Sequence, residues 1–273
     1  MSEPRRYGGA LSPSEAIRLE SQARSMSHLL TQEFQLLNLR PNMKVLDAGC
    51  GSGAITRLMA KAVYPETVVG MDIDPVFIEK ARNNADSEAL ANIRFDLGNI
   101  DAMDYDDDFF DFSYCRLVLM HVNDPVKSVS EMKRVTRKGG YVAASSIDDT
   151  SMIAYPDTPR FWDLWRKYGA RASQRGVNRF IGRELYSIFN KAGLSSVSVH
   201  PMPFYATARN PAGLEEICSV AIGILLSSRS GMVSDGIALD EDFEKMIEEI
   251  NQMKNDEGAF AMCFTFLAIG KVE

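Results

Sequence analysis

The fold is decided by the stretch Val45-Leu46-Asp47-Ala48-Gly49-Cys50-Gly51-Ser52-Gly53, in which a short apolar run ends in an acid and opens into three glycines. The apolar run indicates a buried strand. After it, apolar side chains recur at helical spacing, namely Ile55, Leu58, Met59, Ala62 and Val63. The stretch therefore predicts a strand, a tight turn and a helix, and in an open parallel sheet such a turn lies where ligands bind.

The acid in this turn discriminates between two classes of ligand. A dinucleotide site places pyrophosphate on the loop and on the N-terminus of the next helix, where the carboxylate of Asp47 would repel it. S-adenosylmethionine fits better, because it carries an ammonium and a sulfonium group and no phosphate. A glycine turn without a ligand is the alternative at this point.

A second acid ends the next apolar run, Val68-Val69-Gly70-Met71-Asp72. Asp72 follows Gly53 by 19 residues, close to the offset of about 20 that is typical of an acid bound to ribose hydroxyls. Asp74 and Pro75 come next and form a helix start signal. We therefore expect Asp74 to cap that helix and Asp72 to remain available for a ligand.

These motifs resemble class I S-adenosylmethionine-dependent methyltransferases, and among them the small-molecule group of the quinone-biosynthesis type (methyltransferase type 11/25). The resemblance is strong over residues 40–147 and looser beyond. It implies an α/β fold, a Rossmann-like doubly wound sheet of seven strands with an antiparallel last strand, plus a helical cover. It assigns the cofactor to Asp47, Ala48, Gly49, Gly51, Gly53, Asp72, Ile73, Asn99, Ile100, Cys115 and Arg116.

One position departs from the family pattern. The family often has Gly-Asp-Ala where this chain has Gly98-Asn99-Ile100, and the family's acid meets the adenine amino group. The amide oxygen of Asn99 can still accept from that amine. We also expect Tyr7, Gln22 and Arg24, near the N-terminus, to touch the methionine carboxylate or close over it.

Two residues are candidates for a general base. His121 follows the predicted fourth strand, and an imidazole titrates near neutral pH. Asp148 follows the fifth strand and faces the acceptor side in this topology. A structural role is the alternative for both, because positioning alone can supply much of the rate.

Strand and helix patterns alternate along the chain, which predicts a parallel sheet. Two stretches exceed what that sheet needs, and we interpret them as a cover over the cofactor crevice. The expected divisions are an N-terminal helical cap (1–39), a cofactor-binding core (40–148), a helical lid (149–182), core again (183–206), a helical insertion (207–257) and a terminal strand (258–273).

Composition limits the partners. The formal net charge is −7 over 273 residues, which disfavours a nucleic-acid partner. The longest apolar runs fall short of a membrane span, there is no signal-peptide pattern, and the four cysteines form no CxxC pair. These features predict a cytoplasmic protein without a metal site. The acids between Asp104 and Asp111 lack the spacing of a calcium loop, so a solvated loop is the favoured interpretation.

The arginines between Arg160 and Arg183 allow two interpretations, a solvated helix face or a contact with an anionic acceptor. We expect an enzyme that transfers a methyl group to a small molecule. The alternatives are a protein or tRNA methyltransferase, a non-catalytic protein that binds the cofactor, and a nicotinamide-dependent reductase. The acceptor, its reacting atom and the oligomeric state are not readable from the sequence.

Overall fold

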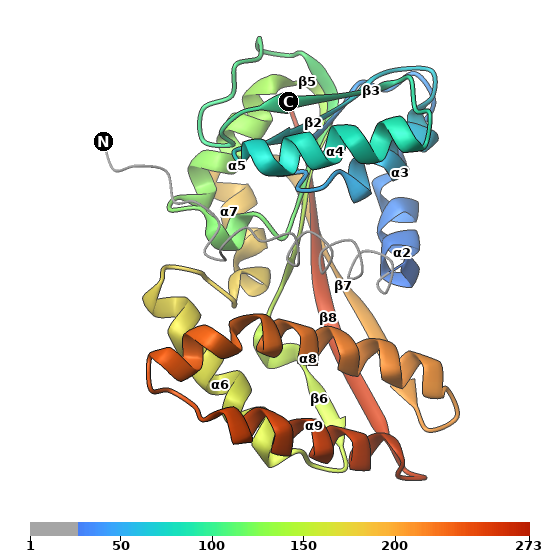
Figure 1. Ribbon diagram of the computed structural model, residues 1–273. Helices are drawn as coiled ribbons and strands as arrows, with labels where there is room; N and C mark the ends of the chain where they lie inside the picture. The colour runs from blue at the N-terminus through green and yellow to red at the C-terminus, as the bar shows by residue number, and fades with distance from the viewer. Residues whose placement is uncertain (1–26) are drawn as a thin grey trace.

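The computed structural model describes residues 27–273, and Figure 1 shows their arrangement. Within these residues eight strands form one sheet in the order β3-β2-β1-β4-β5-β8-β6, and β7 pairs with the other edge of β8. The first five strands are parallel, and β8 is antiparallel to its neighbours. The strands are β1 (Val45–Ala48), β2 (Val68–Asp72), β3 (Ile93–Leu97), β4 (Phe110–Arg116), β5 (Thr136–Ile147), β6 (Ile153–Tyr155), β7 (Ser195–Thr207) and β8 (Phe260–Lys271).

Helices cover both faces of the sheet and build a second layer below it (Figure 1). α3 packs with β1, β2 and β3, whereas α5 and α7 pack against β4, β5 and β8. The helices are α2 (Ser27–Leu37), α3 (Ala54–Val63), α4 (Pro75–Ser87), α5 (Pro125–Val135), α6 (Pro159–Gln174), α7 (Leu185–Lys191), α8 (Pro211–Ser234) and α9 (Asp240–Lys254). The predicted α/β class and the antiparallel last strand beside the sixth are confirmed.

Local signals explain where the core helices begin. Asp74 accepts a hydrogen bond from the backbone N–H of Val76 at 2.8 Å, and Pro75 occupies the first turn, as predicted. Asp124 caps α5 in the same way, with its carboxylate on the N–H of Lys127 at 3.0 Å. These caps leave Asp72 outside the helix, at the end of β2.

The sheet has one strand more than the seven predicted. β5 pairs only with residues 265–271 of β8, so the first half of β8 extends beyond the end of β5. The remaining half of β8 pairs with β6 on that side and with the far end of β7 on the other. β7 and β8 thus form a long ribbon that leaves the core sheet and runs into the lower helical layer (Figure 1).

The lower layer has its own hydrophobic cluster. Side chains of α6, α8 and α9 pack there with the distal ends of β7 and β8, and Phe243, Met246 and Leu225 are fully buried in it. The helical insertion predicted over 207–257 contains the two helices α8 and α9. Of the N-terminal helical cap predicted over 1–39, the described part contains α2, and residues 1–26 lie outside the described residues.

α8 is apolar on almost all sides. In the described part of the chain it is long and apolar enough, by length and composition, to cross a membrane, and 28% of the relevant window is buried. Core helices meet the same criterion. One side of α8 packs into the cluster of the lower layer and another lines a cavity with Val220, Ala221 and Ile224. A helix between two apolar surroundings needs apolar residues around most of its circumference.

Two neighbouring leucines of α8 provide a matched test of this packing. Leu225 is fully buried and Leu226 is 37% exposed. We expect Leu225→Ala to lower the free energy of unfolding by about 2–5 kcal/mol, because it leaves a cavity. Leu226→Ala should cost less than about 1 kcal/mol. Urea denaturation measures both, and equal losses would contradict the placement of α8.

Candidate functional site

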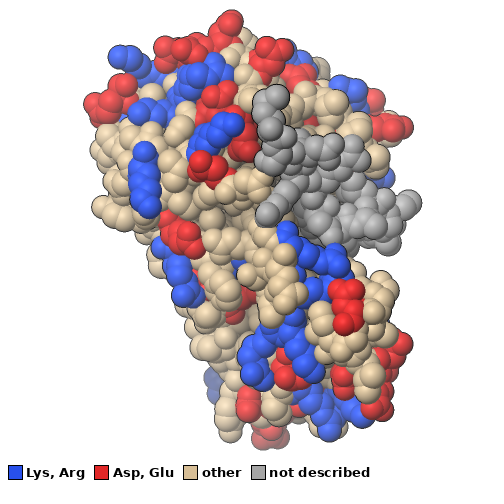
Figure 2. Space-filling view, turned by 90° about the vertical axis from the view of Figure 1, so that its left-hand side faces the viewer, with Lys and Arg blue, Asp and Glu red and all other residues tan. Residues whose placement is uncertain are grey.

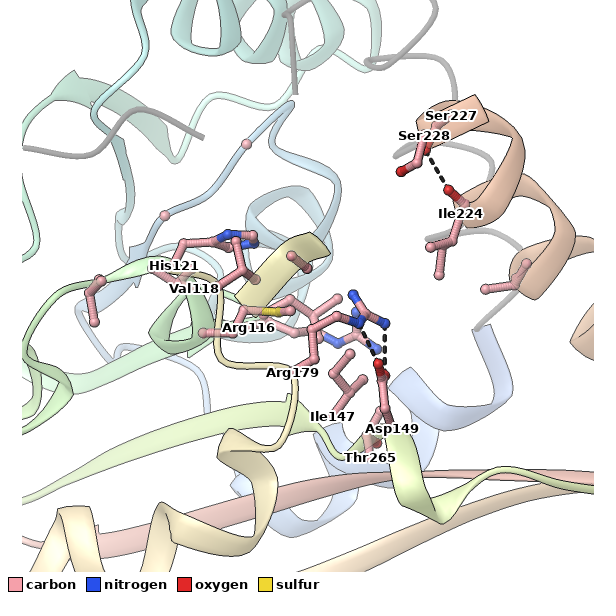
Figure 3. A pocket seen from close by; sticks show the side chains of 18 of the residues that line it. Arg116, Val118, His121, Ile147, Asp149, Arg179, Ile224, Ser227, Ser228 and Thr265 are labelled. Carbon is pink, nitrogen blue, oxygen red and sulfur yellow. Dashed lines mark hydrogen bonds and ion pairs between the residues drawn. The ribbon is translucent and has the colours of Figure 1, made fainter. Parts of the chain in front are cut away.

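A cavity of about 850 Å³ opens between the carboxyl ends of β1, β2 and β4 and the helices α6 and α8. This volume lies in the upper part of the range for ligand pockets. Figure 3 shows its interior, with His121, Val118 and Arg116 from the end of β4 on one side and Ile224, Ser227 and Ser228 of α8 across from them. The cavity therefore joins the glycine turn to the lower helical layer.

The glycine turn and Asp72 form one hydrogen-bonded unit. The backbone N–H of Gly51 donates to Oδ2 of Asp72 at 2.9 Å, and the N–H of Asp74 donates to Oδ1 at 3.0 Å. Burial raises the pKa of Asp72, although these hydrogen bonds oppose the shift. Each carboxylate oxygen keeps a second lone pair, so Asp72 can still accept two hydrogen bonds from a ligand.

Asp47 lies at the end of the central strand, paired with Gly70 on one side and Tyr114 on the other. It is only 2% exposed, and the hydroxyl of Thr56 donates to its Oδ2 at 2.7 Å. Burial raises the pKa of Asp47 to about 7, and the hydrogen bond from Thr56 opposes that shift only in part. A cation bound beside Asp47 would favour the ionised form.

Glu33 was missed by the sequence analysis. This residue of α2 is fully buried, and it accepts hydrogen bonds from the hydroxyls of Tyr114 at 2.7 Å and Ser145 at 2.6 Å. Its Oε2 lies 3.4 Å from Nε of Arg116, which lines the cavity. A signal was available, because Glu33 stands three residues after Leu30 and four before Leu37, on the buried face of the helix.

His121 ends a short 3₁₀ helix, Leu119–His121, that follows β4 and lines the cavity. Burial lowers the pKa of His121 to about 4, and the positive charge of Arg179 acts in the same direction. The imidazole is therefore neutral at pH 7 and can accept a proton.

Asp148 lines the cavity but makes several interactions there. Its carboxylate accepts hydrogen bonds from Arg183 through both Nε and Nη2, and from the N–H and hydroxyl of Thr150 at 3.0 and 2.7 Å. Desolvation alone would raise the pKa of Asp148, but the hydrogen bonds from Arg183 and Thr150 outweigh it and hold the pKa below its usual value. Such a carboxylate is a weaker proton acceptor than His121.

Arg179 forms a buried ion pair at the middle of the cavity (Figure 3). Its Nε and Nη2 donate to the two oxygens of Asp149 at 2.5 and 2.8 Å. The guanidinium lies over the rings of Trp165 and Tyr168, at 5.2 and 4.7 Å from their centroids. The pair neutralises both charges and joins the core to α6, and neither partner was among the predicted site residues.

Most of the predicted site residues line this one cavity. They are Asp47, Gly49, Gly51, Asp72, Ile73, Asn99, Ile100, Arg116, His121 and Asp148. The side chains of Ala48 and Cys115 belong instead to the hydrophobic core. Gly53 also lies off the cavity wall, where a Cβ would meet the ring of Phe95 at 2.8 Å, so it serves close packing. Tyr7, Gln22 and Arg24 lie outside the described residues.

The two ends of the cavity differ in charge. Carboxylates of Asp47, Asp72 and Asp101 lie at the glycine-turn end, and Arg171 and Arg175 lie at the α6–α8 end. Within residues 27–273 no group of three or more His, Cys, Asp or Glu side chains is arranged to hold a metal ion. The arrangement suits a ligand that presents positive charge to the glycine turn.

Comparisons with known proteins agree with this geometry. Residues 39–193 match the family model described as a methyltransferase domain. An uncharacterized methyltransferase of Schizosaccharomyces pombe is 33% identical over 158 residues, which are 56% of this chain and 56% of that protein. Demethylmenaquinone methyltransferase of Bacillus cereus is 27% identical over 190 residues, 65% of this chain and 80% of that protein. The chain spans about half the length, 56% and 47%, of two of the curated relatives that it matches.

A solved structure shares the fold. Phosphoethanolamine N-methyltransferase 2 of Haemonchus contortus, in complex with S-adenosyl-L-methionine, aligns with a TM-score of 0.60 and 16% identity over 94% of this chain and 57% of that chain. The family model covers more than half of the present sequence. The chain therefore belongs to the methyltransferase domain family, and its resemblance to class I S-adenosylmethionine-dependent methyltransferases is confirmed.

Proposed function

We propose that this protein transfers a methyl group from S-adenosylmethionine to a small-molecule acceptor. The observation that carries the proposal is the cavity that joins the glycine turn to apolar walls from α6 and α8. An acceptor enclosed between these walls is a small molecule rather than a folded macromolecule. The similarity to a protein named demethylmenaquinone methyltransferase also supports a small-molecule acceptor.

The residues at the glycine turn fit the adenosyl half of the cofactor. Asp72 retains lone pairs for both ribose hydroxyls, and Ile73, 37% exposed at the cavity wall, offers an apolar surface to the adenine. Oδ1 of Asn99 accepts from the N–H of Asp101 at 3.0 Å and keeps one lone pair for the adenine amine. The chain thus binds the nucleoside through side chains that are already oriented.

The charges beside the turn fit the methionine half. Asp47 faces the cavity from β1 and would attract a cationic group. Arg116, held by Glu33 at the end of β4, would pair with the carboxylate. When bound, S-adenosylmethionine supplies an electrophilic methyl group, and the surrounding residues align it and exclude water.

His121 is our candidate for the general base. It lines the cavity, and its lowered pKa keeps it neutral over most of the working pH range. Asp148 remains a second candidate, although Arg183 and Thr150 already bind it. We further propose that the segments 149–182 and 207–257 form the cover of the site, because α6 and α8 supply its apolar walls.

A cytoplasmic location completes the proposal. The four cysteines all lie in the described part of the chain and are free thiols. Burial raises the pKa of Cys50, Cys115, Cys218 and Cys263, so none is a reactive thiolate. Buried free thiols are typical of a reducing compartment.

The reaction itself is tested by release of S-adenosylhomocysteine during incubation with S-adenosylmethionine. We expect release with members of a panel of phenols, quinols, thiols and small acids, and none with unfolded peptides or tRNA. Release with peptide or tRNA alone would overturn the small-molecule assignment.

Asp72→Ala removes the acceptor for the ribose hydroxyls. We expect the affinity for S-adenosylhomocysteine to fall about 10- to 100-fold, because hydrogen bonds to a charged group are worth about 1.5–3 kcal/mol. Isothermal titration calorimetry measures the loss. Asp86→Ala, on the exposed side of α4, is the matched control and should bind like the unmodified protein. Undiminished binding by Asp72→Ala would contradict the assignment of this residue.

The pKa of Asp47 predicts a pH dependence of cofactor binding. Cation binding requires the ionised carboxylate, so the affinity for S-adenosylmethionine should rise by about tenfold per pH unit up to a pH of about 7 and then level off. Binding at pH 6 should also release a proton, which titrations in buffers of different ionisation enthalpy detect. Asp47→Asn should flatten the profile, and a profile unchanged by that substitution would exclude Asp47 as the titrating group.

The raised pKa of Asp47 also determines how the stability of the fold changes with pH. The folded pKa of about 7 lies above the ordinary value of 3.8. The contribution of Asp47 to stability is therefore complete below pH 3.8 and is lost as the pH rises through about 7.

His121→Ala tests the general base. If His121 accepts the proton of the acceptor, the turnover number should fall by about 10²- to 10⁴-fold while cofactor affinity is retained. Steady-state release of S-adenosylhomocysteine with a substrate from the panel measures the change. Full turnover in the variant would assign the rate to positioning instead.

A further inference from the structure

Two arginines line the cavity at the end far from the glycine turn, namely Arg171 of α6 and Arg175 at the C-cap of this helix, and both contact one acid. Arg171 and Arg175 are one helical turn apart and both line the cavity. Nε of Arg171 lies 2.7 Å from Oδ2 of Asp235, and Nη2 of Arg175 lies 3.5 Å from the same oxygen. Two guanidinium groups thus share one carboxylate, which leaves one positive charge uncompensated in this group.

Among residues 27–273, the other ionic groups nearby on the cavity wall do not cancel this charge. Arg179 and Asp149 neutralise each other in a bidentate pair, and Asp148 is held by Arg183. The side chain of Arg175 is 49% exposed and that of Arg171 is 12% exposed. In the lower half of the face drawn in Figure 2, several basic side chains lie close together, with acidic side chains among them.

A glycine inside α8 makes room for Arg171. A Cβ at Gly231 would lie 2.3 Å from Nη2 of Arg171, so the guanidinium rests against the helix backbone. Glycine in a helix interior costs about 1 kcal/mol relative to alanine. Gly231 therefore makes the helix less stable but allows the guanidinium of Arg171 to approach the helix backbone closely. Ser228 and Ser230 of α8 line the cavity beside it and offer hydroxyl donors.

Between this basic end and the glycine turn, α6 and α8 present apolar side chains to the cavity, and the charged residues Arg179 and Asp149 that also line it are paired with each other. Trp165 and Tyr168 of α6 face the cavity, as do Ile217, Val220, Ala221 and Ile224 of α8. A molecule that fills this space presents an apolar body to the helices and a polar group to the arginines.

We propose that Arg171 and Arg175 bind a carboxylate on the methyl acceptor, which is an apolar molecule with one negative charge. This inference rests on the proposed function, because the bound molecule is a methyl acceptor only if the protein transfers a methyl group to it. A monoanion neutralises the single excess charge, and the arginine fork matches a carboxylate geometrically. A phosphate monoester has suitable oxygens too, but its second charge would remain unpaired.

Three probes of one chain length separate these chemistries. Octanoate, octyl phosphate and octanol are titrated calorimetrically into the whole protein, with and without S-adenosylhomocysteine. We expect octanoate to bind at least tenfold tighter than octanol and tighter than octyl phosphate. Equal affinity for octanoate and octanol would overturn the proposal, and preference for octyl phosphate would replace the carboxylate by a phosphate.

Four variants assign the effect to this group. Arg175→Gln and Arg171→Gln should weaken octanoate at least fivefold and leave octanol unchanged. Asp235→Asn should tighten octanoate, a gain that a misfolded protein would not show. Arg166→Gln, on the exposed face of α6 with 77% of its side chain exposed, is the matched control and should have no effect. If neither Arg171→Gln nor Arg175→Gln weakens octanoate binding, the proposal is wrong.

The test is separable from the proposed function. Binding of S-adenosylhomocysteine is measured in the same samples and should be equal in all five proteins, because Arg171 and Arg175 lie away from the glycine turn. Failure of the unmodified protein to bind S-adenosylhomocysteine would refute the cofactor site. The preference among the three probes, read without cofactor, would still decide the role of the arginines.

Discussion

The position of β1 between β2 and β4 is the constraint on which the rest of the structure depends. From β1 the sheet grows outward in two directions, toward β3 on one side and β5 on the other. The segments that leave β1 and β4 therefore diverge, with α3 packed on one face and α5 on the other. The crevice opened by this divergence receives Asp47, the glycine turn and the start of His121's 3₁₀ helix. Asp47, Asp72 and Arg116 lie at the ends of β1, β2 and β4 around this crevice.

This arrangement removes charged side chains from water, which is energetically unfavourable. Asp47 near the end of β1, Glu33 in the middle of α2 and Arg116 at the end of β4 are nearly removed from water. The hydroxyls of Thr56, Tyr114 and Ser145 stabilise the carboxylates, yet the raised pKa of Asp47 shows that desolvation prevails there. A site built in this way is prepared for a cation, because a bound cation supplies what the fold leaves uncompensated. α2 takes part through Glu33, so this helix is tied to the site as well as to the core.

The ribbon of β7 and β8 connects the core sheet to the lower helical layer. It continues past the end of β5 and carries the helical layer that closes the cavity. α8 lies between the cluster of that layer and the cavity, which accounts for its apolar composition. The glycine turn and the helices α6 and α8 thus line one cavity, although they come from distant parts of the chain.

Local patterns were enough to predict the core, and distant contacts explain what was missed. The strand and helix around Gly49–Gly53 follow from short-range periodicity, and so do Asp72 and the cap at Asp74. The spacing of Glu33 from Leu30 and Leu37 indicated a buried position, but its partners Tyr114 and Ser145 could not be predicted, because they lie 81 and 112 residues away. The strand β6 was not predicted for a similar reason, because it pairs with the distant first half of β8. The contact of Arg171 with Gly231 depends on how α6 and α8 pack, which no local pattern encodes.

The central claim is that the strand ends around Asp72, Asp47 and Arg116 form the cofactor site. A crystal structure of the protein with S-adenosylhomocysteine tests it most directly. The account predicts both ribose hydroxyls within hydrogen-bond distance of Asp72 and the homocysteine moiety between Asp47 and Arg116. An adenosine bound elsewhere in the cavity, or a ribose turned away from Asp72, would contradict it.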